Sequence, residues 1–441
     1  MKLLKYIFIV ACLYIYIYSP PLKMLPFGLI QVMTPVAYVY LAVNRLFGKM
    51  FRLYRKEIGI FLILCIYSFI REVLASSDLS FFYDSLFMLV DVIPIAFFIS
   101  HFAFFNFSSS GIEGMQGKLL NLFVYTAVIA GLITFYLILN PTMAEVMNKG
   151  ILRSGEVEYE STYRSFGFAS SLLFAYAIVQ GLAVAILLFK VEKQSIKTYP
   201  ALILMIVLLV ISILFNARIG FAPIAVMTVY LLIMKRSYKL IIACAVLLPL
   251  LSYLLFNSSL SYLFGENLDW SLKFFTETQQ LLSNKSTSDA SNYDVLFNDM
   301  LFMPDTAGSI IFGIGQDIII HAKRNSDIGY VRQLFFGGMI YLSILFYLIT
   351  SMFLRLRKIR FARWFNFLFI FTTLVCEIKG IMLSNNSAFR TLILLYVGII
   401  YLDAIRKGRN SVAKKKESFN ARNLGNVESV VDSGSIQPVA N

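Results

Sequence analysis

The chain consists mainly of long apolar runs separated by short polar gaps. Runs such as LILMIVLLVISILF do not alternate apolar and polar positions, which favours helices over the strands of a membrane barrel. A hydrocarbon core about 30 Å thick needs about 20 apolar helical residues to be crossed, and about 17 is the lower limit. This length predicts an all-α polytopic membrane protein with twelve spans, at residues 4–20, 25–44, 57–75, 80–101, 119–139, 166–189, 200–216, 219–234, 239–256, 333–353, 362–383 and 388–405.

The composition excludes several other classes of protein. Of the 441 residues, 59% are hydrophobic and 15% are charged, which does not describe soluble domains. The net charge of +14 resides in the gaps between apolar runs, so we expect no nucleic-acid partner. HExxH, CxxC and DxD patterns are absent, and we expect neither a metal nor another cofactor. The cysteines lie within apolar runs and predict no disulfide framework: Cys12, Cys65, Cys244 and Cys376.

The distribution of Lys and Arg predicts the orientation in the membrane. With the N-terminus in the cytoplasm, 26 of the 39 Lys and Arg residues are cytoplasmic, as is typical of inner-membrane proteins. The clusters Arg45 to Lys56 and Arg355 to Arg363 anchor this orientation, which also places the C-terminus in the cytoplasm. Two long external segments follow from it, 140–165 and 257–332.

We therefore expect two parts in the chain. Residues 1–405 form the transmembrane domain, including both long external segments. Residues 406–441 are basic, then rich in Ser and Asn, and they predict a disordered cytoplasmic tail near an anionic leaflet. The first run begins with Lys2 and Lys5 like a signal peptide, but YSPPLK has no small-residue cleavage site, so we expect a retained span.

Charged residues inside predicted spans need either a partner or a function. Asp84 and Asp91 are seven residues apart and share one helical face, which must be turned toward the bundle interior. A Lys or Arg of a neighbouring helix is one explanation for them, and a functional role is the other. Glu377 and Lys379 point to nearly opposite sides of a helix and cannot satisfy each other. Lys379 lies toward the external end and is either structural or substrate-binding.

Arg218 follows Asn216 in the external turn between two strongly apolar runs. Its guanidinium has little protein surface to cover it there. A planar set of donors at the membrane surface suits a lipid-linked phosphate or diphosphate. The alternative is that Arg218 extends to lipid headgroups without a specific ligand.

The segment GSIIFGIGQDIIIHAKRNSDIGYVRQLFFGGMIYLSILF, residues 308–346, is the richest in candidate chemistry. A carboxylate or imidazole beside several cations can act as a general base next to an anion-binding wall. The alternative is a solvated loop whose charges pair with one another. Its glycines predict a tight turn at Gly313 and Gly315 and close helix approach at Gly337 and Gly338. The candidate side chains are Asp317, His321, Lys323, Arg324, Asp327, Tyr330 and Arg332.

At these residues the chain resembles the O-antigen polymerases (Wzy type) and, more distantly, the O-antigen ligases. The resemblance rests on the many spans, on NARIGFAPI with its helix-opening arginine, and on GIGQD followed by SDIGYVRQLFFGG. It implies a GT-C-like glycosyltransferase at the periplasmic face of the bacterial inner membrane. Such an enzyme transfers a growing glycan from polyprenyl diphosphate to a sugar hydroxyl of the next lipid-linked repeat unit. A ligase or a flippase for lipid-linked sugars remains an alternative.

The resemblance also implies roles for individual residues. Arg218 matches the arginine expected to hold the diphosphate, and the base stays open between Asp327 and His321 because the ligases have a histidine near the position of Asp327. We expect undecaprenyl diphosphate-linked repeat units as substrate, with a chain-length regulator and a flippase as possible membrane partners. Further substrate-binding side chains are expected at Arg164, Arg324, Tyr330, Arg332, Lys379 and Arg390.

Overall fold

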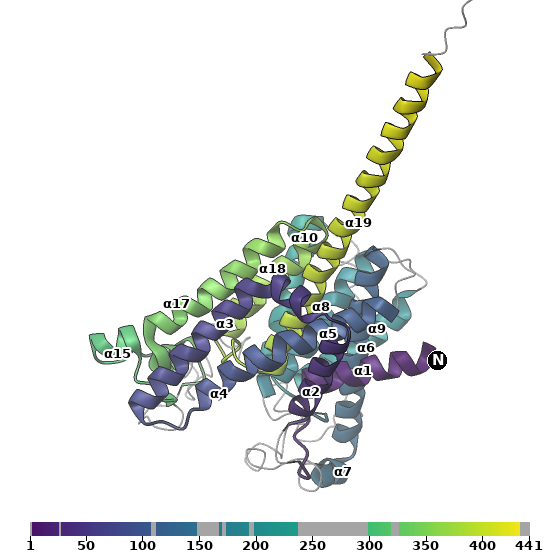
Figure 1. The fold of residues 1–441 in the computed structure, drawn as a ribbon. Coiled ribbons are helices and arrows are strands. Elements are labelled where there is room, and N and C mark those ends of the chain that lie inside the picture. Colours follow the sequence, from purple (N-terminus) through teal and green to yellow (C-terminus); the bar gives the residue numbers. More distant parts are fainter. Residues whose placement is uncertain are drawn as a thin grey trace, which may run out of the picture.

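The computed structural model describes residues 2–25, 28–106, 112–147, 167–169, 173–193, 198–236, 299–318 and 326–432. The regular elements in these ranges are helices, as the apolar runs predict (Figure 1). They are α1 (Lys2–Tyr18), α2 (Leu29–Val43), α3 (Phe47–Ala75), α4 (Ser80–Phe87), the π-helical turn η1 (Met88–Val92), α5 (Ile93–Asn106), α6 (Ile112–Leu139), α7 (Pro141–Val146), α8 (Leu173–Lys193), α9 (Tyr199–Leu214), the 3-10 turn η4 (Arg218–Gly220), α10 (Phe221–Lys235), α15 (Ala307–Phe312), α17 (Gly329–Arg357), the 3-10 turn η6 (Arg360–Ala362), α18 (Arg363–Cys376) and α19 (Ser387–Asp432).

The length and composition of the helices are compatible with a polytopic membrane protein. Among the described residues, seven helices are long and apolar enough to cross a bilayer, and α1, α2 and α9 are shorter apolar helices. The ninth predicted span, 239–256, lies outside the described residues. The seven are Phe47–Ala75, Ser80–Asn106, Gly114–Leu139, Phe174–Glu192, Arg218–Lys235, Gly329–Arg357 and Ser387–Ser411.

Helix α8 is the central helix of the bundle. Its side chains from Ala175 to Phe189 are buried, and α6, α9, α10 and α19 pack around it. A helix that is apolar on all sides must be covered on all sides, and small residues such as Ala177 and Gly181 let its neighbours approach closely. The elements that carry the candidate site are built on this helix.

The fourth predicted span continues to Asn106 and contains the π-helical turn η1 at Asp91. Pro94 lies two residues after this turn, and it has no N–H to donate to the carbonyl of Val90 four residues earlier. The hydroxyl of Tyr38 donates to that carbonyl instead, over 3.1 Å. A π-helical turn of this kind is common at functional or strained positions, and here it lies at a buried carboxylate.

Helix α17 is broken at Gly338, where φ is 65° and ψ is −167°. The segment after α15 docks into this break, because the N–H of Ile314 donates to Phe335 over 2.6 Å and that of Gly315 donates to Phe336 over 2.8 Å. The backbone conformation at Gly338 is essentially restricted to glycine. The close approach predicted from the glycines is therefore confirmed, and it fixes the first part of α17 against the segment that precedes Asp317.

Helices α3 and α17 pack side by side in opposite directions. Near the end of α3, Arg71 donates to the carbonyl of Gly313 over 2.7 Å, and near its start, Glu57 accepts from Arg355 of α17 over 2.9 Å. The two clusters Arg45 to Lys56 and Arg355 to Arg363 consequently share one end of the bundle, which we name the basic end. The start of α17 lies at the other end, which we name the site end.

Helix α19 continues to Asp432 and extends away from the other helices (Figure 1). The sequence predicts a disordered tail from residue 406, whereas the structure describes a helix as far as Asp432. Lys and Arg are frequent between 406 and 432 and favour helix, and no proline occurs there. Residues 433–441 lie outside the described part of the chain.

Candidate functional site

The turn η4, which carries Arg218, lies directly on α8. A Cβ atom at Gly181 would be 1.9 Å from the carbonyl oxygen of Gly220, and a Cβ at Gly220 would be 2.5 Å from the carbonyl oxygen of Ala177. The two backbones therefore touch, and this contact fixes the turn. Arg218 opens the helical segment that continues as α10, as the sequence predicts.

The start of α17 reaches the same helix through the segment 377–386. The N–H of Gly329 donates to the carbonyl of Glu377 over 2.9 Å. A Cβ at Gly380 would lie 2.8 Å from the ring of Phe174, near the start of α8. Phe174 and Ala177 are three residues apart and share a helical face, with a rise of about 4.5 Å between them. The Arg218 turn and the segment 377–386 thus contact neighbouring turns of α8, and the start of α17 is bonded to that segment.

Glu377 organises the segment 377–386. Its side chain is fully buried, and its Oε2 accepts hydrogen bonds from the N–H groups of Met382 and Leu383 over 2.9 and 3.1 Å. The sequence predicts that the eleventh span extends to residue 383, but α18 ends at Cys376. The helix ends before the predicted boundary. The Glu377 carboxylate accepts from the N–H groups of Met382 and Leu383, which a continuing helix would have bonded to backbone carbonyls. As predicted, Glu377 and Lys379 do not satisfy each other.

Asp327 and Lys379 form an ion pair at the site end. Lys379 Nζ lies 3.2 Å from Asp327 Oδ2, and both side chains are 47% exposed. The sequence suggests Arg324 or Arg332 as the structural partner of Asp327. Arg332 instead donates to Asp317, from Nε over 3.2 Å and from Nη2 over 2.5 Å. Among the described residues, Lys379 is the cation that pairs with the Asp327 carboxylate, which stays half exposed.

The remaining predicted site residues are less suited to substrate contact or lie outside the described ranges. Tyr330 donates its hydroxyl hydrogen to the carbonyl of Leu374 over 2.9 Å, so this group fastens α17 to α18. Its ring stacks on Phe346 at a centroid distance of 6.0 Å. His321, Arg324 and Arg164 lie outside the described residues.

Arg390 is buried at 3% exposure rather than open to a substrate. It donates to a carbonyl of α1 over 3.1 Å and interacts electrostatically with both Asp84 and Asp91. Asp84 also accepts from the N–H of Asn385 over 2.9 Å, and Asp91 accepts from the hydroxyl of Thr34 over 2.8 Å. Arg390, on a neighbouring helix, thus acts electrostatically on both carboxylates.

A buried polar cluster beside the Arg218 turn is not among the features predicted from the sequence. Tyr176 and Gln180 lie one turn apart on α8, and Ser212 and Asn216 lie one turn apart on α9 and the turn after it. The repeat of polar side chains at a spacing of four residues within apolar runs is the signal that could have revealed them. The Tyr176 hydroxyl is hydrogen-bonded to the hydroxyls of Thr134, over 2.6 Å, and Ser212, over 3.5 Å. The Gln180 amide donates to the Tyr18 hydroxyl over 3.1 Å, and the Asn216 amide donates to the carbonyl of Ser212 over 2.7 Å.

The arrangement provides cations and a carboxylate, which suit an anionic substrate and proton transfer. Within the described ranges, no group of three or more His, Cys, Asp or Glu side chains is placed to hold a metal ion. Comparison of the chain with protein-family models finds no match. A search of curated proteins finds no match either.

Proposed function

We propose that this protein is a membrane glycosyltransferase that polymerises lipid-linked oligosaccharide repeat units, as O-antigen polymerases do. The growing glycan passes from undecaprenyl diphosphate to a hydroxyl of the incoming unit. One observation gives the main support: the Arg218 turn and the segment that carries Lys379, the ion-pair partner of Asp327, contact neighbouring turns of α8. A diphosphate-binding cation and an accessible carboxylate are the two groups that this reaction needs.

In the proposed reaction, the bond between the anomeric carbon of the glycan and the diphosphate breaks. The acceptor hydroxyl oxygen forms the new bond to that carbon, and its proton passes to the Asp327 carboxylate. Arg218 donates to the departing diphosphate, whose negative charge grows as the bond breaks. The contribution of Arg218 is therefore larger in the transition state than with bound substrate.

Substitution of Arg218 tests this proposal. We expect Arg218→Ala to abolish long chains and Arg218→Lys to restore only a little, because lysine keeps the charge but loses the two-pronged geometry. Glycan length is measured on gels from cells that contain each variant at the wild-type amount. Arg406→Ala, an exposed arginine on α19, is the matched control and should leave the length distribution unchanged. Normal glycan length in Arg218→Ala would contradict the proposal.

A flippase of lipid-linked sugars is a second candidate, favoured by the buried charges of Arg390 and Asp91 and the half-buried Asp84. Cells lacking the protein distinguish the candidates. Single repeat units on the cell surface indicate a polymerase, and retention of single units in the cytoplasm indicates a flippase. An undecorated lipid A core with polymer accumulating on the carrier lipid indicates a ligase.

A further inference from the structure

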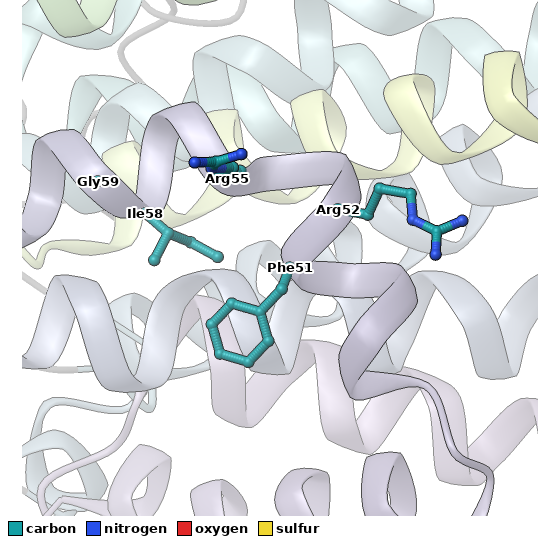
Figure 2. A pocket seen from close by; sticks show the side chains of 5 residues that line it. All are labelled: Phe51, Arg52, Arg55, Ile58 and Gly59. Carbon is teal, nitrogen blue, oxygen red and sulfur yellow. The ribbon is translucent and has the colours of Figure 1, made fainter.

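A groove of about 620 Å³ lies on the outer side of α3, at the basic end and away from the candidate site. Figure 2 shows its lining side chains, which are Phe51, Arg52, Arg55, Ile58 and Gly59. Their spacing of three, four and seven residues places them along one side of the helix. The groove thus combines two guanidinium groups with an apolar wall.

The groove coincides with a bend in α3, where Tyr54 leaves helical geometry at φ −118° and ψ 21°. The bend is fixed from the inner side. Arg355 donates to the carbonyl of Leu53 over 2.5 Å, and the hydroxyl of Tyr54 donates to the carbonyl of Val397 over 2.8 Å. These contacts come from α17 and α19, so the shape of the groove is set before any ligand binds.

The charges around the bend leave the groove strongly basic. Glu57, the acidic residue on this part of α3, points inward at 1% exposure and is neutralised by Arg355. Lys49 and Lys56 lie over the rings of Tyr401 and Tyr347, at 4.7 and 5.1 Å from the ring centroids.

Arg52 and Arg55 differ from these neighbours. Both are exposed, and neither has a hydrogen-bond or ion-pair partner within the part of the chain that the structure describes. Figure 2 shows the two guanidinium groups extending to different sides of the bend, so each can donate to a different oxygen atom of an anionic headgroup.

The apolar wall of the groove continues along α3 toward the membrane-spanning part of the helix. Ile58 is followed at helical spacing by Leu62 and Ile66, whose side chains are 48% and 52% exposed. Exposed apolar side chains on a spanning helix are the surface that lipid chains cover. This side of α3 therefore carries cations at Arg52 and Arg55 and an exposed apolar strip from Ile58 to Ile66.

We propose that this groove binds an anionic glycerophospholipid of the adjoining leaflet. The phosphate contacts Arg52 and Arg55, and the acyl chains lie along Phe51, Ile58 and the strip beyond. Charge complementarity and the continuous apolar strip favour a lipid over a protein segment, and basic residues at a membrane surface attract anionic lipids.

Thermal unfolding of the purified full-length protein in detergent tests the proposal. We expect added phosphatidylglycerol, but not phosphatidylcholine, to raise the Tm of the wild-type protein, because a ligand that binds only the folded state stabilises it. The double variant Arg52→Ala/Arg55→Ala should lose this rise. Arg406→Ala/Arg409→Ala removes the same charge from exposed positions on α19 and should keep it.

A second variant blocks the groove without changing the charge. A Cβ at Gly59 would meet no atom within 4 Å, so Gly59→Leu fits the fold and fills the groove. We expect it to lose the phosphatidylglycerol response while its Tm in phosphatidylcholine stays near that of the wild type. Equal loss in the α19 control, or a full response in Gly59→Leu, would show general charge attraction instead. A response to undecaprenyl phosphate but not to phosphatidylglycerol would also overturn the proposal.

Discussion

Asp327 is the residue on which the proposed proton transfer depends most. Its ion pair with Lys379 is half exposed, and such a pair contributes about 1 kcal/mol or less to stability. A general base contributes about 100- to 10,000-fold to a rate. We therefore expect Asp327→Asn to lower glycan polymerisation by about that factor while protein abundance stays unchanged, measured by glycan length on gels beside an immunoblot.

Lys379→Met provides the control, because it breaks the same ion pair and keeps the carboxylate. If Asp327 only holds Lys379 in place, the two variants should have the same effect. If it takes the proton, Asp327→Asn should be much the more damaging of the two. Normal chain length in Asp327→Asn would remove this residue from the mechanism and leave His321 as the candidate base.

Arg390 has a structural role that contrasts with its predicted role in substrate binding. Removing one partner from a buried group of charges costs about 3 to 5 kcal/mol, because the others stay buried without compensation. We expect Arg390→Met to lower the free energy of unfolding by about that amount in denaturation experiments, and Arg406→Met to have little effect. Adding Asp91→Asn should recover part of the loss. A stable but inactive Arg390→Met protein would return this residue to the substrate site.

The sequence could predict these charged residues but not their partners. Asp84 and Asp91 stand out because buried carboxylates need compensation, yet Arg390 is far away in the chain and only the packing of α19 brings it near. In the same way, Arg332 is the obvious neighbour of Asp327 in sequence. The docking of the segment before Asp317 into the break of α17 gives Arg332 a different carboxylate.

At the scale of elements, the contact between α8 and η4 connects the fold to the proposed chemistry. A Cβ at Gly181 would overlap the carbonyl of Gly220, so Gly181→Ala must push the Arg218 turn away. We expect a loss of about 1 to 3 kcal/mol in stability from overpacking. Polymerisation should fall about 100-fold, the cost of misplacing a catalytic group by about 1 Å.

The matched control for this variant is Gly131→Ala on α6. The nearest atom to its added Cβ would be 3.5 Å away, at ordinary van der Waals distance. Differential scanning fluorimetry and gel analysis of glycan length check both quantities. Equal activity of Gly181→Ala and Gly131→Ala would mean that the position of the turn does not matter for function.

Helix existence was easier to predict than helix ends. Apolar runs of sufficient length identify α3, α6 and α8, because burial in lipid requires them. The end of α18 at Cys376 was not predicted, because apolar residues resume after Glu377 and Lys379, at Ile381 to Leu383. After Cys376 the Glu377 carboxylate accepts hydrogen bonds from the backbone N–H groups of Met382 and Leu383, and such bonds cannot be read from an apolar pattern.

At the scale of the whole molecule, contacts between distant residues join residues that are predicted to lie on the same side of the membrane. Lys5 contacts Asn106, Lys49 contacts Tyr401 and Arg355 contacts Glu57, and all of these belong to the predicted cytoplasmic side or its border. Asp317 with Arg332, and Asp327 with Lys379, belong to the opposite side. The bundle thus has a basic end and a site end, in agreement with the alternation that the charge distribution predicts.

This arrangement leads to a topology prediction that the whole proposal depends on. In a cysteine-free variant of the full chain, we expect Lys56→Cys and Arg360→Cys to resist a membrane-impermeant maleimide added to intact cells, and Asp305→Cys and Asp327→Cys to react. The reason is that the basic clusters share one end while Asp305 and Asp327 lie at or near the other. Permeabilised cells, in which all four positions should react, control for buried thiols.

Labelling of Arg360→Cys in intact cells, with Asp327→Cys protected, would place Arg218 and Asp327 on the cytoplasmic side. The proposed polymerisation at the outer face would then be impossible, because its base and its diphosphate-binding arginine would face the wrong compartment.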